Sequence, residues 1–127
     1  MHRDIRWPNV LRIGTSDIWF LVDLDDALQF PAIAITGAHL HMKYHAPEIF
    51  SQDTHDYAVD LWSIGHLMSA SKRFIDSTEL EELKQRLLSE DPKARPQIDE
   101  CIKIIKDQAD KLPVTLPTSQ QYLEKVK

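Results

Sequence analysis

The chain has little cysteine, little glycine and no long apolar run. Its single cysteine, Cys101, excludes an internal disulfide and fits a reducing compartment. No apolar stretch approaches the length of a bilayer-spanning helix, and the first residues lack the pattern of a signal peptide. Lysine and arginine form no long block and the net charge is −5. We therefore expect an intracellular protein, cytoplasmic or nuclear, with no nucleic-acid or membrane partner.

A length of 127 residues allows one domain at most. Two β-prone runs, at 9–14 and 17–22, flank a turn-forming stretch and predict a small antiparallel hairpin. Residues 23–44 show no sustained period and contain proline and glycine, so they predict a long ordered loop. Long loops inside compact domains are more often functional than incidental.

Helical patterns account for most of the rest of the chain. A short helix is expected at 46–52, and the apolar pattern of 56–70 predicts a helix buried on nearly all sides. A third helix is expected at 76–90 with Asp76 as its N-cap, and a fourth at 95–112. The apolar stripes expected to face the core are Leu80, Leu83, Leu87 and Leu88 on the third helix, and Ile98, Cys101, Ile102, Ile105 and Ala109 on the fourth.

These patterns together predict a mainly α fold with a small β-hairpin. One lobe is expected to span residues 1–112, and a proline-containing connector with a short helix or tail is expected at 113–127.

The stretch "HRDIRWPN" carries the first chemical motif. His2, Arg3, Asp4 and Asn9 match the pattern H-R-D-x-x-x-x-N. In a phosphotransferase, the carboxylate lies beside the acceptor hydroxyl and the amide oxygen binds a metal that bridges the phosphates. A pattern with four fixed positions also occurs by chance, so a surface turn is the alternative interpretation.

Four further landmarks follow in order: "DLD" at 23–25, "APE" at 46–48, "DLWSIG" at 60–65 and "DPKARP" at 91–96. With the first motif, they resemble the C-terminal lobe of eukaryotic-type protein kinases over about residues 2–111. The stretches "HRDIRWPNVL" and "WFLVDLDDA" are also similar to divergent kinase-like domains of fungi and of crinkler-type effectors.

The resemblance implies a set of catalytic roles. Asp4 would be the catalytic base, and Arg6 would steady the transferred phosphoryl group. Asn9 and Asp23 would bind Mg²⁺ together with ATP.

The resemblance also implies structural roles. His2 and Arg3 would support the loop, and Asp60 would hold its backbone. Glu48 would pair with Arg95 and tie the "APE" segment to the last helices.

Some positions depart from the kinase pattern. Asp25 replaces the usual glycine after the metal-binding aspartate, which leans toward aminoglycoside- and choline-type phosphotransferases. His41 stands where serine/threonine kinases normally have threonine, and the interval from Gly65 to Arg95 is short for the family. The phosphoryl acceptor therefore stays open.

The parts that grip a nucleotide are missing from the chain. Its three glycines are far apart, so no G-x-G-x-x-G loop exists, and no lysine stands on a preceding strand. We therefore interpret the chain as the catalytic-lobe fragment of a protein kinase-like phosphotransferase acting on Ser/Thr hydroxyls, inactive alone. The N-terminal lobe is absent, and that lobe, a partner protein or a second copy would complete it. The alternatives are a pseudokinase or interaction scaffold, and a small-molecule phosphotransferase.

Three histidines, His39, His41 and His45, have spacings that a zinc ion could use. A closed zinc site needs four ligands and no cysteine is near, which favours an exposed segment without metal.

Overall fold

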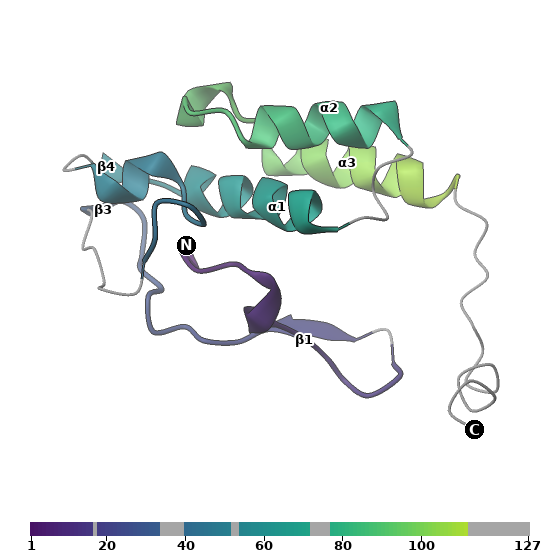
Figure 1. Cartoon of the computed structure of the whole chain (residues 1–127), viewed down its shortest axis with the longest axis horizontal. Coiled ribbons are helices and arrows are strands. Elements are labelled where there is room, and N and C mark those ends of the chain that lie inside the picture. The colour runs from purple at the N-terminus through teal and green to yellow at the C-terminus, as the bar shows by residue number, and fades with distance from the viewer. Residues whose placement is uncertain (17, 34–39, 52–53, 72–76, 112–127) are drawn as a thin grey trace.

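The computed structural model describes residues 1–16, 18–33, 40–51, 54–71 and 77–111, and within them the fold is mainly helical (Figure 1). Its α-helices are α1 (Ala58–Ala70), α2 (Thr78–Leu87) and α3 (Ile98–Ala109). Its strands are β1 (Val10–Arg12), β2 (Trp19–Leu21), β3 (Ala32–Ile33) and β4 (Thr54–His55). Short 3₁₀ helices are η1 (Trp7–Asn9), η2 (Pro47–Phe50) and η4 (Pro92–Ala94). The predicted segment 113–127 lies outside the described residues, as do His39 and Asp76.

The predicted hairpin is confirmed. Strands β1 and β2 pair antiparallel, with Val10 opposite Leu21, and Gly14 takes a φ of 51° in the turn between them. The hairpin projects from the side of α1 opposite to α2 and α3 (Figure 1). All its strand residues except Val10 are exposed.

A second antiparallel pair was not predicted. Strand β3 pairs with β4, with Ala32 opposite His55, so the expected loop at 23–44 contains a strand. The prediction missed it because a strand of two residues has no readable period.

The core lies where α1 packs on α2 and α2 packs on α3 (Figure 1). As expected, most of α1 is buried, including Val59 and Leu61. The three helices together form one buried cluster, made of Leu61, Met68, Leu80, Leu83, Leu87 and Cys101. Gly65 allows this close approach, since a Cβ there would lie 2.8 Å from the Cβ of Leu87.

Two predictions about the later helices were wrong. The N-cap of α2 is Ser77, whose hydroxyl accepts a hydrogen bond from the backbone N–H of Leu80 at 3.3 Å. Helix α3 packs through Cys101, Ile104 and Gln108. Four members of the predicted stripe are exposed: Ile98, Ile102, Ile105 and Ala109.

No helix in the described part of the chain is long and apolar enough to cross a membrane.

Candidate functional site

The loop from His2 to Asn9 is fixed to the centre of the fold by Asp60 of α1. The backbone N–H groups of His2 and Arg3 donate to the two carboxylate oxygens of Asp60, each at 2.8 Å. Arg3 takes a φ of 71°, a backbone conformation that L-residues rarely adopt. The described contacts therefore place Asp60 as the anchor of this loop, at the position where the sequence predicted such a contact.

The ring of His2 ties the loop to the end of β2. Its Nδ1 accepts from the backbone N–H of Asp4 at 3.3 Å, so its Nε2–H is available to donate to the carbonyl of Val22 at 3.1 Å. Because His2 is buried, these two hydrogen bonds fix the backbone of Asp4 relative to the end of β2.

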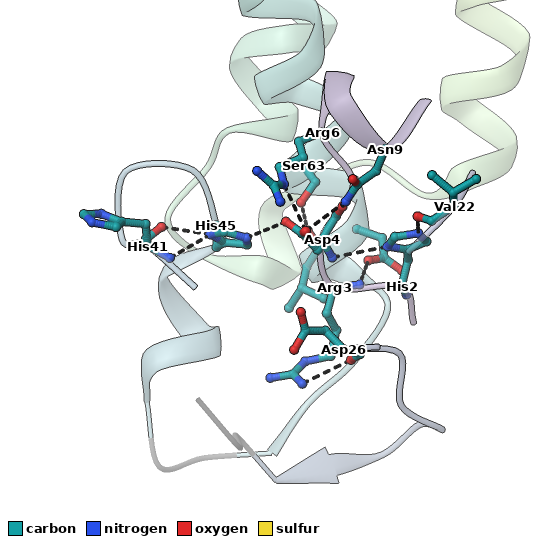
Figure 2. Close-up of polar contacts among 12 residues, drawn as sticks. His2, Arg3, Asp4, Arg6, Asn9, Val22, Asp26, His41, His45 and Ser63 are labelled. Atoms are coloured by element: carbon teal, nitrogen blue, oxygen red, sulfur yellow. Dashed lines mark hydrogen bonds and ion pairs between the residues drawn. The ribbon is translucent and has the colours of Figure 1, made fainter. Parts of the chain in front are cut away.

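Asp4 is buried and lies at the centre of a cluster of polar side chains (Figure 2). One carboxylate oxygen, Oδ1, lies 2.9 Å from Nε2 of His45. The other, Oδ2, accepts from Nε of Arg6 at 2.9 Å and from Nδ2 of Asn9 at 2.8 Å. The loop therefore brings together three residues that the sequence predicted as catalytic, Asp4, Arg6 and Asn9.

The cluster keeps Asp4 ionised. Burial alone would raise the pKa of Asp4, but hydrogen bonds from His45 and Arg6, the charge of Arg6 and a hydrogen bond from Asn9 outweigh it. The net effect lowers the pKa of Asp4 below its ordinary value of 3.8. The carboxylate is therefore an acceptor of hydrogen bonds at neutral pH, suited to orienting a hydroxyl.

His45 was missed as a partner of Asp4. Its ring is buried, and its Nδ1 lies 3.0 Å from both the backbone N and the carbonyl O of His41. From the sequence, we considered His45 only as a zinc ligand. Its position directly before "APE" was the signal that could have indicated a contact with the loop. The described residues contain no group of three or more metal-binding side chains that includes His45.

Asn9 and Asp23 lie on either side of the base of the hairpin. The amide nitrogen of Asn9 donates to the carbonyl and to Oδ2 of Asp4, which leaves its amide oxygen to act as a ligand. The N–H of Val22 donates to the carbonyl of Asn9 at 3.0 Å, and the next residue, Asp23, is exposed. Asp23 has a φ of 68° without being glycine. Strained backbone of this kind concentrates at functional sites.

These two residues fit a magnesium ion better than a metal that needs a full protein cage. Mg²⁺ usually keeps several waters and takes one or two carboxylates together with substrate phosphates. One carboxylate and one amide oxygen therefore suffice, although no cluster of three His, Cys, Asp or Glu side chains suited to a metal exists among the described residues.

The Glu48–Arg95 pair predicted from the sequence is present. Both terminal nitrogens of Arg95 donate to the Glu48 carboxylate, with Nη2 to Oε2 at 3.0 Å, and Nη1 also donates to the carbonyl of Ala58 at 2.8 Å. The Arg95 side chain has no exposed surface. The pair therefore joins η2 to the start of α1 and to the loop before α3.

Comparison with known proteins gives one clear relative. The chain is 40% identical over 109 residues to Crinkler effector protein 8 of Phytophthora infestans. This match covers 83% of the chain and 18% of that protein, so the chain spans about a fifth of its relative's length. No protein-family model matches the chain. The chain is thus homologous, over most of its length, to one segment of a Crinkler effector.

Proposed function

We propose that the chain forms the catalytic lobe of a protein kinase-like phosphotransferase, which moves the γ-phosphoryl group of ATP to a Ser or Thr hydroxyl of a protein. The observation that carries the proposal is the buried carboxylate of Asp4, which accepts hydrogen bonds from Arg6 and Asn9. The carbonyl of Asn9 is bonded to the N–H of Val22, the residue before the exposed Asp23. The relative is named an effector, and we propose that this chain belongs to such an intracellular effector.

The residues divide the work as follows. Asp4 orients the acceptor hydroxyl and accepts its proton. Asn9 and Asp23 hold Mg²⁺, which neutralises charge on the phosphates when it is bound. The Arg6 side chain is about half exposed, so its guanidinium can turn from Asp4 toward the transferred phosphoryl group. That movement would also open the buried Asp4 carboxylate to a hydroxyl.

A pseudokinase or interaction scaffold is the second candidate. The observation in its favour is that both oxygens of Asp4 are already engaged, with a side-chain exposure of only 3%. A small-molecule phosphotransferase is the third candidate, and it is favoured by the acidic Asp25 after the metal-binding aspartate.

Phosphoryl transfer from γ-labelled ATP with Mg²⁺ tests the proposal, using the full-length protein that contains these residues. We expect labelled protein serine or threonine, reduced about 100-fold or more by Asp4→Asn and unchanged by Glu82→Gln on the exposed side of α2. The 127-residue chain alone is expected to be inactive, since it has no glycine-rich loop.

The other outcomes separate the alternatives. Label only on a small molecule would support the small-molecule phosphotransferase. Absence of label, or equal label with Asp4→Asn, would contradict the proposal and favour the scaffold.

A further inference from the structure

A cavity of about 310 Å³ lies away from the Asp4 cluster, where β4 meets η2 and η4. Its walls come from Phe30 and Pro31 before β3, from residues 54–56, and from residues 91–93. The volume is at the lower end of the range for small-molecule sites. Neither Asp4, Asn9 nor Asp23 lines it, so the proposed phosphotransfer chemistry does not use it.

His55 is the unusual residue in this cavity. Only 4% of its surface is exposed, and neither ring nitrogen has a hydrogen-bond partner among the described residues. Burial lowers the pKa of His55 and the positive charge of Arg3 lowers it further, so the ring is neutral at pH 7 and keeps a lone pair. A buried polar group without a partner costs free energy, which a bound donor would recover.

The charges around His55 favour a cation. Three carboxylates, those of Glu48, Asp56 and Asp91, and one ammonium, that of Lys93, line the cavity, while Arg3 acts on His55 from outside the lining. Arg95 engages both oxygens of Glu48, so Glu48 is already matched.

In each of the other two carboxylates, only one oxygen accepts a hydrogen bond. Oδ1 of Asp56 accepts the backbone N–H of Ala58 at 2.8 Å, and Oδ1 of Asp91 accepts that of Lys93 at 2.9 Å. The second oxygen of each has no partner among the described residues and can accept from a ligand. Two carboxylate oxygens are therefore free to accept from a ligand in the cavity, and the unpartnered imidazole of His55 lies in its wall.

We propose that this cavity, the His55 pocket, binds a guanidinium group. A guanidinium presents several N–H donors in one plane, which suits acceptors arranged around a small cavity. The exposed ring of Phe30 and the neighbouring prolines provide apolar surface for its flat face and for a methylene chain. A bare metal ion fits less well, because the described residues contain no group of three side chains able to hold one.

NMR of the His55 ring nitrogens during a titration of the full chain tests the proposal. The probes are the peptide acetyl-Gly-Arg-Gly-amide, the same peptide with citrulline in place of arginine, and ethylguanidinium. Citrulline has the shape of arginine without its charge. We expect a saturable shift with the arginine peptide in the millimolar range and binding at least about fivefold weaker with the citrulline peptide. If the peptide binds more tightly than ethylguanidinium, the natural ligand is an arginine side chain, and equal affinities indicate a small free guanidine.

Two double variants locate the binding. Asp56→Asn with Asp91→Asn should weaken the arginine peptide about fivefold, since asparagine keeps each backbone hydrogen bond but removes the charge. Asp99→Asn with Asp107→Asn, on α3, should change nothing. A dispersed amide spectrum will show that each variant folds. The proposal is overturned by a lack of saturable shift, by equal binding of both peptides, or by an Asp56/Asp91 variant that binds as tightly as the original chain.

Discussion

At the scale of single residues, Asp4 is held by two donors from its own loop and by one residue from a distant segment. Arg6 and Asn9 lie in its own loop, while His45 comes from the segment before η2. Hydrogen bonds from several directions leave a carboxylate little freedom to rotate. A catalytic base requires such a fixed orientation. Through its contact with Asp4, His45 therefore connects the segment before "APE" to the loop.

Removing His45 should destabilise the fold. His45→Leu leaves Oδ1 of the buried Asp4 without its donor, and we expect a loss of about 1–3 kcal/mol in the free energy of unfolding. His45→Gln, which keeps an N–H donor, should lose less. His41→Leu is the control, since that side chain is exposed and should stay within about 0.5 kcal/mol. Urea unfolding measures all three, and equal losses for His45→Leu and His41→Leu would show that the Asp4–His45 contact contributes nothing.

His55 should make stability depend on pH. Its folded pKa lies below the ordinary 6.5, so the unfolded chain binds more protons between these values. The contribution of neutral His55 to the free energy of unfolding is then fully present above about pH 6.5, and it is lost as the pH falls toward the folded pKa. His55→Leu should reduce this loss. The pKa of His66 is also lowered by burial. Because His66 is present in the original protein and in the His55→Leu variant, its effect cancels when their pH profiles are subtracted. Identical pH profiles from urea unfolding would contradict the assignment.

At the scale of elements, α1 could be predicted from its nearly continuous apolar residues, α2 from its leucine stripe, and the hairpin from two β-prone runs around a turn-forming stretch. The packed face of α3 could not be predicted from hydropathy. Gln108 is buried there because its side-chain oxygen accepts from the hydroxyl of Ser77, while Ile102 remains exposed. The resemblance to the kinase lobe implied that Asp60 holds the loop, but the contact of His45 with Asp4 depends on how the segment before η2 folds back.

The Glu48–Arg95 pair should couple η2 to the last helices. Glu48→Ala and Arg95→Ala should each cost roughly 3–5 kcal/mol in the free energy of unfolding, because each leaves a buried or half-buried charge uncompensated. The double variant should lose less than the sum. The exposed Arg86–Glu100 pair, at 2.6 Å, is the matched control, and its two substitutions should be close to additive because solvent screens the pair. Strict additivity for Glu48 and Arg95 would mean that they do not interact in solution.

At the scale of the whole molecule, exposed apolar surface is concentrated on the hairpin. We define the hairpin patch as Leu11, Ile13, Ile18, Trp19, Phe20 and Leu21, all of which are exposed. A two-stranded hairpin has marginal stability alone, and large exposed apolar patches mark interaction sites. Helix α1, by contrast, is covered by α2.

The hairpin patch should make the isolated chain self-associate. Light scattering with size exclusion should give a mass above 14.7 kDa that rises with concentration. Trp19→Ser with Phe20→Ser should return the mass to that of the monomer, while Ile102→Ser with Ile105→Ser on α3 should not. A fixed monomer mass at high concentration for the original chain would show that the described fold needs no partner.

The central claim is that Asn9 and Asp23 bind one metal ion beside Asp4, and paramagnetic Mn²⁺ tests it most directly. Mn²⁺ takes oxygen ligands as Mg²⁺ does and broadens the NMR signals of nearby nuclei. In the isolated chain, we predict that the amide signals of Asn9 and Asp23 broaden first and that Asp23→Asn abolishes the effect. Broadening centred on the acidic first turn of α3, at Asp99 and Glu100, or unchanged by Asp23→Asn, would contradict the account.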